Sequence, residues 1–177
     1  MKKLLVVVDI QNDFVDGALG TKEAVAIIPN VIKKIKEWDG DVICTRDTHD
    51  SDYLETSEGK HLPVEHCIEG TVGHYINDDV FGAIADSITH NSVNILDKYT
   101  FGSTALPEVI RHAKYDYVEL IGLCTDICVV SNALILKANF PETHIAVDAS
   151  CCAGVTPESH NAALTTMKMC QIDVIGV

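Results

Sequence analysis

The sequence has little positive charge and no long apolar run, and each of these absences excludes some classes of function. It holds 13 lysines and arginines against 26 aspartates and glutamates, a formal net charge of −13 at pH 7. Such a surface repels nucleic-acid phosphates and anionic lipid, so we expect neither nucleic acid nor a membrane among its partners. No apolar run reaches the roughly 20 residues that cross a bilayer. The short run at residues 4–8 is interrupted by Asp9, which favours a buried first strand over a signal peptide and predicts a cytoplasmic protein.

Three motif classes are absent as well. None of the seven cysteines forms a Cys-x-x-Cys pair, which argues against a zinc ribbon or a thioredoxin-like site. An odd number of cysteines also argues against a disulfide framework, and we expect reduced thiols that mostly pack in the core. No Gly-x-Gly-x-x-Gly or Gly-x-x-x-x-Gly-Lys loop follows an apolar run, which argues against a nucleotide-binding site.

Short apolar runs alternate with helical patterns along the chain. We expect strands at Leu4–Ile10, Asp41–Thr45, Val93–Leu96, Tyr117–Ile121, His144–Val147 and Ile172–Val177. We expect helices at Ala24–Trp38, Ser103–His112, Asp126–Ala138 and Glu158–Met169. Within the first of these, Pro29 predicts that the regular helix begins there. The alternation predicts the α/β class, with residues 1–177 as a single three-layer α/β/α domain around a mostly parallel six-stranded sheet.

Chemically useful side chains follow several of these runs. In an open parallel sheet the site lies beyond the carboxyl ends of the strands, where Asp9, Lys98 and Cys128 are all expected. Cys128 would lie in the first turn of a helix, where the dipole lowers a thiol's pKa and backbone N–H groups can bind an oxyanion. Asp9 is a plausible acceptor of the thiol proton, and Lys98 could hold Asp9 ionised. A cysteine at a helix start is more often a packed core residue, and only the coincidence of the three favours catalysis.

The stretch from Asp47 to Phe81 is long, aperiodic and rich in ligand-type side chains. Asp47 and His49 lie on one side of an extended segment, and His66 follows further along the loop. Together they form a plausible site for Zn²⁺, Fe²⁺ or Mn²⁺, although solvated loop histidines are the more common outcome. The loop holds four further side chains that could ligate: Glu55, Glu58, His61 and Cys67.

Several segments together resemble the isochorismatase-like cysteine hydrolase superfamily, and most of all its nicotinamidase/pyrazinamidase branch. In family order they are Val7-Val-Asp-Ile-Gln-Asn-Asp-Phe14, Asp47-Thr-His49, His66-Cys-Ile-Glu-Gly-Thr-Val-Gly73, Lys98-Tyr-Thr-Phe-Gly-Ser103 and Gly122-Leu-Cys-Thr-Asp-Ile-Cys128-Val129. Each motif is modest alone, but their order and compatible spacing over nearly the whole chain make the resemblance specific.

The resemblance implies a catalytic triad of Asp9, Lys98 and Cys128 that hydrolyses a small carboxamide through a thioester. Asp9 would take the thiol proton and pass it to the leaving ammonia. The resemblance also implies a cis peptide bond between Leu123 and Cys124, with the N–H groups of Cys124 and Cys128 forming the oxyanion hole. In this interpretation the substrate is nicotinamide or a related amide.

The same resemblance assigns Asp47, His49 and His66 to a divalent metal ion, with Glu58 as a fourth ligand. Zinc is the first expectation, with iron or manganese as alternatives. The metal would bind the pyridine nitrogen of the substrate, and Phe14 would pack on its ring. Exposed apolar helices could also support a homo-oligomer.

Two departures from the family pattern bear on the substrate. The segment Leu62-Pro63-Val64 lacks the tryptophan that many nicotinamidases carry there, and Cys124 stands where they usually have alanine. A hydrolase of another small amide, or of an enol ether, is therefore the alternative. A non-catalytic binding protein on the same scaffold is a third hypothesis, against which the intact Asp9, Lys98 and Cys128 argue.

Overall fold

The structure is a computed structural model that describes residues 1–87 and 93–177. The strands are β1 (Lys3–Val8), β2 (Asp41–Asp47), β3 (Val93–Lys98), β4 (Tyr117–Leu123), β5 (His144–Ala153) and β6 (Asp173–Ile175). The helices are α1 (Asn12–Val15), α2 (Lys22–Glu37), α3 (Ser57–His61), α4 (Asp78–Ser87), α5 (Leu106–Ile110), α6 (Val130–Asn139) and α7 (Pro157–Met169). Short helical turns lie at η1 (Tyr53–Glu55), η2 (Val72–His74) and η3 (Thr125–Val129), the last of them π-helical.

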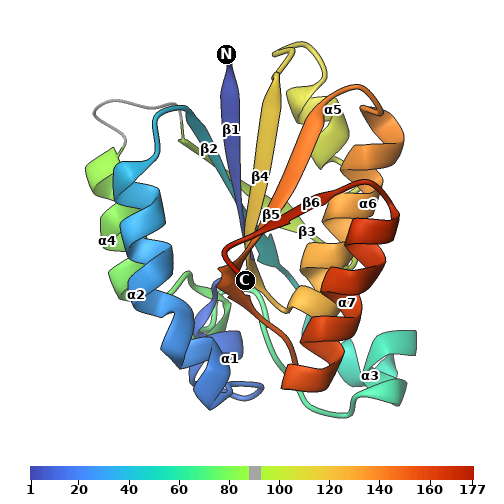
Figure 1. Cartoon of the computed structure of the whole chain (residues 1–177). Helices are drawn as coiled ribbons and strands as arrows, with labels where there is room; N and C mark the ends of the chain where they lie inside the picture. The colour runs from blue at the N-terminus through green and yellow to red at the C-terminus, as the bar shows by residue number, and fades with distance from the viewer. Residues whose placement is uncertain (88–92) are drawn as a thin grey trace.

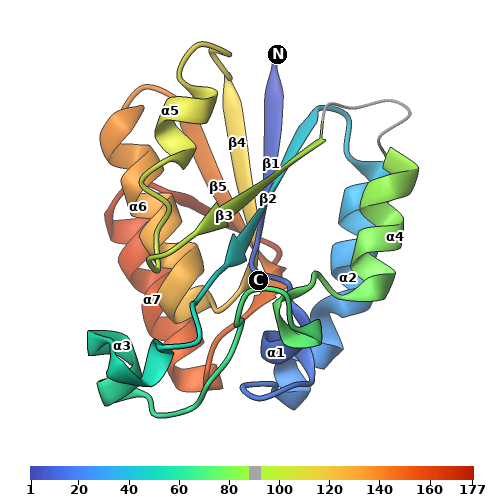
Figure 2. The same ribbon diagram turned by 180° about the vertical axis from the view of Figure 1, so that it is seen from behind.

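The described strands form one sheet in the order β3-β2-β1-β4-β5-β6, and every neighbouring pair is parallel. Helices α2 and α4 cover one face of this sheet, and α5, α6 and α7 cover the other (Figures 1 and 2). This arrangement confirms the predicted α/β class with three layers. Helices α1 and α3 lie beyond the carboxyl ends of the strands, at the bottom of Figure 1.

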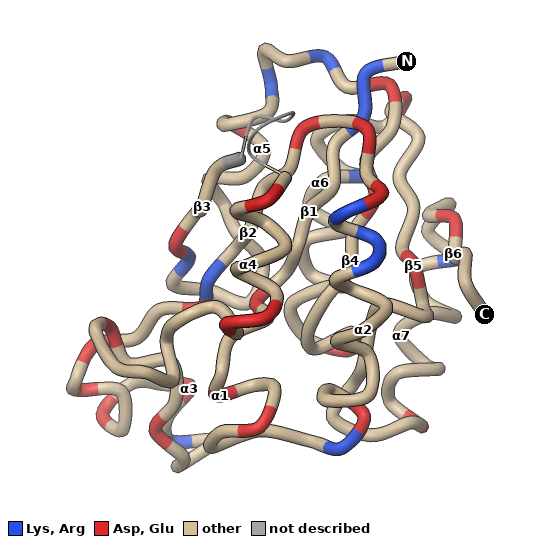
Figure 3. The backbone as a smooth tube through the Cα atoms, turned by 90° about the vertical axis from the view of Figure 1, so that its left-hand side faces the viewer, with Lys and Arg blue, Asp and Glu red and all other residues tan. Residues whose placement is uncertain are grey.

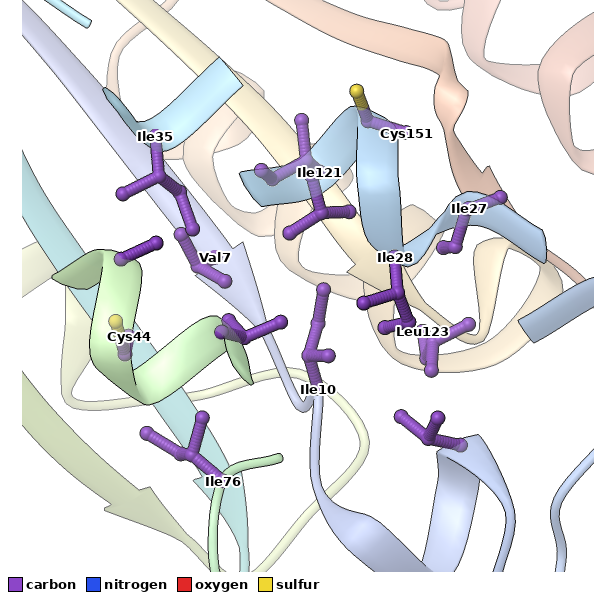
Figure 4. Close-up of a cluster of buried hydrophobic side chains, with 14 of the residues drawn as sticks. Val7, Ile10, Ile27, Ile28, Ile35, Cys44, Ile76, Ile121, Leu123 and Cys151 are labelled. Atoms are coloured by element: carbon purple, nitrogen blue, oxygen red, sulfur yellow. The ribbon is translucent and has the colours of Figure 1, made fainter. Parts of the chain in front are cut away.

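Strand β1 is apolar and buried from Leu4 to its end at Val8, as expected of a strand covered on both faces of the sheet. Leu5 and Val7 pack in the cluster beneath α2 and α4 (Figure 4), and Leu4, Val6 and Val8 pack in the cluster beneath α6 and α7. Successive side chains of a strand point to opposite faces, so one apolar run supplies both layers of the core. The central strand is thereby fixed in register, and with it the residues that follow.

Helix α2 begins earlier than its proline suggests. The side chain of Thr21 accepts a hydrogen bond from the Ala24 N–H at 3.0 Å and caps the helix, which continues through Pro29 to Glu37. A proline inside a helix costs about 3 kcal/mol, because it removes one backbone hydrogen bond and crowds the preceding turn. The apolar face of α2 is buried on both sides of Pro29, and we infer that this burial outweighs the cost. The prediction that the regular helix starts at Pro29 is wrong.

Other element boundaries differ from the predicted ones. The predicted helix Asp126–Ala138 is divided into the π-helical turn η3 and the regular helix α6. Strand β5 is longer than expected, because the residues beyond Val147 remain paired with β4 past an irregularity in the register. Helix α5 and strand β6 are shorter than expected. The long loop after Asp47 contains η1, α3 and η2, none of which its composition indicates.

The register of the sheet brings the functional candidates to one edge. Val8 pairs with Thr45 on β2 and with Gly122 on β4, and Asp47 pairs with Lys98 on β3. Gly122 has φ +126°, and a Cβ there would lie 2.0 Å from the carbonyl oxygen of Val8. Only glycine allows β4 to approach β1 this closely at the point where the chain turns toward Cys128.

Acidic residues outnumber basic ones in the sequence, 26 against 13. Figure 3 shows aspartates and glutamates spread over the loops and helices, with the basic residues in fewer segments. Among the helices of the described ranges, none has the length and apolar character needed to cross a membrane.

Candidate active site

Cys128 lies in η3, directly beyond the carboxyl end of β4. Its side chain is buried, and the Lys98 ammonium donates a hydrogen bond to its Sγ atom at 3.5 Å. The peptide bond between Leu123 and Cys124 is cis, where the family resemblance implies one. Leu123 and Cys124 line the same cavity as Cys128.

Asp9 follows β1 and is fully buried beside this thiol. Its backbone adopts φ +48°, an uncommon conformation for a residue with a side chain. The Thr45 hydroxyl on β2 donates a hydrogen bond to Asp9 Oδ1 at 2.6 Å, and the Lys98 ammonium lies 2.7 Å from Asp9 Oδ2. Oδ1 therefore accepts a hydrogen bond and Oδ2 has an ion-pair partner, and the two contacts orient the carboxylate.

Lys98 connects the candidate groups. Its ammonium contacts Asp9 at 2.7 Å, Asp47 Oδ1 at 2.9 Å and Cys128 Sγ at 3.5 Å. Two of these contacts, to Asp47 and Cys128, are hydrogen bonds that the ammonium donates, and the contact with Asp9 is an ion pair. Burial alone would lower the pKa of Lys98, but the charges of Asp9, Cys128 and Asp47 together raise it. The group is therefore a permanent cation within the site.

Burial, together with the charge of Asp9, raises the pKa of the Cys128 thiol well above its ordinary value. The prediction that a helix N-terminus lowers this pKa is wrong for the resting site, because the loss of hydration outweighs the backbone dipoles. Burial also raises the pKa of Asp9, against the opposing charge of Lys98. A carboxylate with a raised pKa is a stronger base, and Asp9 is therefore suited to accept the thiol proton.

Four side chains converge beside this group. Asp47, His49, Glu58 and His66 each offer one ligand atom, and these atoms lie within 4.8 Å of one another. His49 Nε2 lies 3.0 Å from Asp47 Oδ2 and 3.6 Å from Glu58 Oε1. Two carboxylates and two imidazoles carry a formal charge of −2 when the histidines are neutral, which a divalent cation would balance. Nitrogen and oxygen donors in this number suit Zn²⁺, Fe²⁺ or Mn²⁺, so the residues fit the metal that the resemblance implies.

Neighbouring groups orient two of these four side chains. The Nδ1–H group of His66 donates to the Val64 carbonyl oxygen at 2.8 Å, which leaves the Nε2 lone pair directed at the cluster. Glu58 comes from α3, whose first turn Thr56 caps by accepting a hydrogen bond from the Gly59 N–H at 3.0 Å. A Cβ at Gly59 would lie 2.1 Å from the Tyr53 carbonyl oxygen, so glycine is needed for α3 to pack on η1.

A cavity of about 240 Å³ opens onto both groups. Cys128, Asp47, Glu58 and His66 all line it. Its remaining wall is largely apolar and includes Phe14, Leu19, Leu62, Phe101 and Val155. The Phe14 ring lies 5.5 Å from the His66 ring, centroid to centroid. A small planar ring entering this cavity would meet aromatic and aliphatic surface on the way to the thiol.

The other predicted ligand candidates lie elsewhere. His61 is exposed, with its Nδ1 atom 2.7 Å from the Ser57 carbonyl oxygen, and Cys67 is fully buried. Neither of them, nor Glu55, belongs to the cluster of four. Composition alone cannot separate these candidates, because the separation depends on how η1 and α3 fold within the loop.

Two structural residues escaped the sequence reasoning. The fully buried Tyr53 ring lies 4.7 Å from the His49 ring and 4.9 Å from the His66 ring, so it packs against both. Gln11 is also fully buried and bonds to the backbone of Asp47. A polar residue two positions after Asp9, at the end of a buried strand, is the signal that could have indicated Gln11.

The fold and the site together define a class of protein. A parallel α/β sheet presents a buried thiol, a lysine and an aspartate at its carboxyl edge, next to a cluster of metal-type ligands, which is the arrangement of a candidate cysteine hydrolase. The family model for the isochorismatase domain matches residues 3–177. The chain belongs to the isochorismatase family.

Individual relatives resemble the chain over nearly its whole length. The nicotinamidase of Schizosaccharomyces pombe is 27% identical, with 97% of this chain and 92% of that protein covered. The crystal structure of the Bacillus subtilis nicotinamidase/pyrazinamidase has a TM-score of 0.87 at 26% identity, covering 99% of this chain and 100% of that one. The pyrazinamidase of Pyrococcus horikoshii, solved in complex with zinc, has a TM-score of 0.79 at 26% identity and full coverage of both chains.

Proposed function

We propose that the chain is a nicotinamidase-like amidohydrolase that converts nicotinamide, or a closely related small carboxamide, to the acid and ammonia. The observation that carries the proposal is the Lys98 ammonium, which contacts Asp9, Asp47 and Cys128 at once. Relatives named as nicotinamidases, which match this chain over more than nine-tenths of their own length, support the substrate class.

In the proposed reaction, Asp9 takes the proton of the Cys128 thiol as the sulfur attacks the amide carbon. The tetrahedral intermediate collapses to a thioester when Asp9 passes that proton to the leaving ammonia. Water then attacks the thioester with Asp9 as the base, which releases the acid and restores the thiol. Lys98 keeps Asp9 ionised between these transfers and stabilises the thiolate while it exists. The N–H groups of Cys124 and Cys128 are the proposed donors to the oxyanion.

Asp47, His49, Glu58 and His66 are the proposed ligands of a divalent metal, with zinc first and iron or manganese as alternatives. When bound, the ion would supply a Lewis-acid contact for the ring nitrogen of the substrate. Phe14 would pack on the ring, and Leu62 lines the same cavity.

Ammonia release from nicotinamide tests the proposal, with a panel of other small amides assayed in parallel. We expect turnover by the wild type and none by Cys128→Ala. The matched control Cys170→Ala, which removes an exposed thiol at the end of α7, should retain full activity. Intact-mass analysis after rapid quenching should find an acyl adduct on the wild type that is absent from Cys128→Ala. Wild-type turnover by Cys128→Ala would exclude the mechanism, and activity on other amides alone would exclude nicotinamide as the substrate.

A further inference from the structure

The segment Gln11–Phe14 comprises the N-cap and the first three residues of α1, and each of its four residues contacts Asp47 or the loop that follows it. Gln11 bonds to the backbone of Asp47, and Asn12 donates to the Val72 carbonyl oxygen at 2.8 Å. Asp13 accepts a hydrogen bond from the Cys67 N–H, and the Phe14 ring lies against His66. The proposed reaction uses only the last of these four residues.

Gln11 holds Asp47 from both sides of its backbone. The Gln11 amide donates to the Asp47 carbonyl oxygen at 2.8 Å and accepts from the Asp47 N–H at 2.7 Å. Its second N–H donates to the His74 carbonyl oxygen at 2.9 Å. All three bonds are buried, so water cannot replace them when one is lost. The Asp47 carboxylate is thereby aimed both at the ligand cluster and at Lys98.

Asp13 holds the other side of the cluster through Cys67. The Cys67 N–H donates to Asp13 Oδ2 at 2.7 Å, and Cys67 has the uncommon φ value of +48°. This residue directly follows the ligand His66, and its carbonyl oxygen accepts a hydrogen bond from the His49 N–H at 3.0 Å. One carboxylate therefore fixes a backbone turn to which both histidine ligands are attached.

Gly73 leaves the space that this carboxylate occupies. A Cβ at position 73 would lie 2.0 Å from Asp13 Oδ2, far inside van der Waals contact. Any side chain there would displace the Asp13 carboxylate. The glycine therefore provides a second way to perturb the same hydrogen bond without changing Asp13 itself.

We propose that Gln11 and Asp13 are positioning residues for the metal site, Gln11 for Asp47 and Asp13 for His66 and His49. The inference rests on the metal site of the proposed function. Side chains that orient metal ligands through hydrogen bonds commonly contribute about 10- to 100-fold to metal affinity. Because neither residue touches the metal or the reacting atoms, its effect should appear in metal binding and coordination.

The test measures Zn²⁺ affinity by competition with a chromogenic chelator, and the absorption spectrum of bound Co²⁺. Asp13→Ala should weaken Zn²⁺ binding by about tenfold or more and alter the Co²⁺ spectrum. Asp13→Asn should stay close to wild type, because its amide oxygen can still accept from the Cys67 N–H. Gly73→Ala should reproduce the Asp13→Ala result. Gln11→Met, similar in length, removes all three bonds and should weaken binding to a similar degree.

Two control variants match the tested substitutions in kind, one removing a carboxylate and one adding a methyl group. Asp16→Ala removes an exposed carboxylate just after α1, and Gly82→Ala adds a methyl group on α4 where no atom lies within 4 Å. Both should bind Zn²⁺ as the wild type does. Thermal denaturation of each metal-free variant separates a loss of affinity from a failure to fold.

Three results would overturn the inference. Unchanged Zn²⁺ affinity and Co²⁺ spectra in folded Asp13→Ala and Gly73→Ala would overturn only the inference about positioning residues and would leave the proposed reaction intact. An equal loss in Asp13→Asn would show that the charge matters and the hydrogen bond does not. A wild-type protein that binds neither Zn²⁺ nor Co²⁺ would overturn the metal site of the proposed function as well, while ammonia release would still report on the triad.

Discussion

Replacing Lys98 with methionine is the most informative single perturbation of the site, because it removes a buried cation and keeps most of its volume. The ammonium lies 2.7 Å from the Asp9 carboxylate, whose side chain is fully buried. Without Lys98, the lowest-energy response of Asp9 is to bind a proton, since an unpaired carboxylate in this position is costly. Asp9 would then be neutral and could no longer accept the thiol proton.

The size of the destabilisation follows from the free energy needed to protonate Asp9 in the folded state. A carboxyl group protonated only in the folded state costs about 1.4 kcal/mol for each pH unit above its ordinary pKa of about 3.9. The Asp9 contribution is therefore at most about 4 kcal/mol at pH 7 and about 1.5 kcal/mol at pH 5. The unfolded state of the variant binds fewer protons than its folded state, so the deficit grows as the pH rises and shrinks as it falls.

Urea denaturation in the presence of a chelator measures this deficit at both pH values. Lys98→Met should lose more stability at pH 7 than at pH 5, relative to the wild type. The double variant Lys98→Met/Asp9→Asn should recover much of the loss at pH 7, because the buried carboxyl group is gone, but it should not recover activity. Lys33→Met, on the exposed face of α2, is the control and should show no pH-dependent deficit. Equal deficits at the two pH values, with no recovery in the double variant, would refute the electrostatic argument.

Three further substitutions probe single features. Gly122→Ala should destabilise the protein by about 3 kcal/mol or more in urea, because its φ is +126° and the new methyl group would meet a carbonyl oxygen of β1; an unchanged urea midpoint would contradict this. Thr45→Val removes the donor to Asp9 Oδ1 and should lower kcat about tenfold with little change in KM, whereas Thr45→Ser should not; equal rates would count against it. Although burial raises the pKa of Asp148, its bond to Lys34 lowers that pKa overall, so its stabilisation is present above about pH 4 and is lost in acid. Asp148→Asn should therefore lose less stability than the wild type between pH 5 and pH 3 in urea experiments.

Much of the fold could be predicted because its signals are local. The apolar run of β1 and the alternation of strands and helices indicate a parallel sheet without reference to any contact. Helix α2 shows where local rules fail. Pro29 indicates a helix start when read alone, but capping by Thr21 and burial on both sides of the proline extend the helix to Lys22. Such burial is a tertiary property, and no residue near Pro29 reports it.

The site was less predictable than the fold, for a related reason. Asp9, Lys98 and Cys128 could be placed at one sheet edge because each follows a predicted strand of a parallel sheet. The raised pKa of Cys128 could not be predicted, because it depends on how completely the π-helical turn buries the thiol. A position at a helix start predicts a lowered pKa instead. The contacts of Gln11 and Asp13 with the ligand loop were out of reach too. They join residues 36 or more positions apart, and the loop that they hold has no periodic pattern.

The geometry of Asp47 implies that the proposed metal site and the proposed triad are physically coupled. Its Oδ1 atom accepts a hydrogen bond from Lys98 at 2.9 Å, and its Oδ2 atom lies 3.0 Å from His49 Nε2 within the ligand cluster. A movement of this carboxylate toward either side must weaken its contact with the other, because both oxygens belong to one rigid plane. The backbone of Asp47 is held by Gln11 on both sides, so the carboxylate has little freedom to move. We infer that this shared residue keeps the proposed ligand cluster at a constant distance from the thiol, which the proposed attack on a carboxamide attached to a bound ring would require.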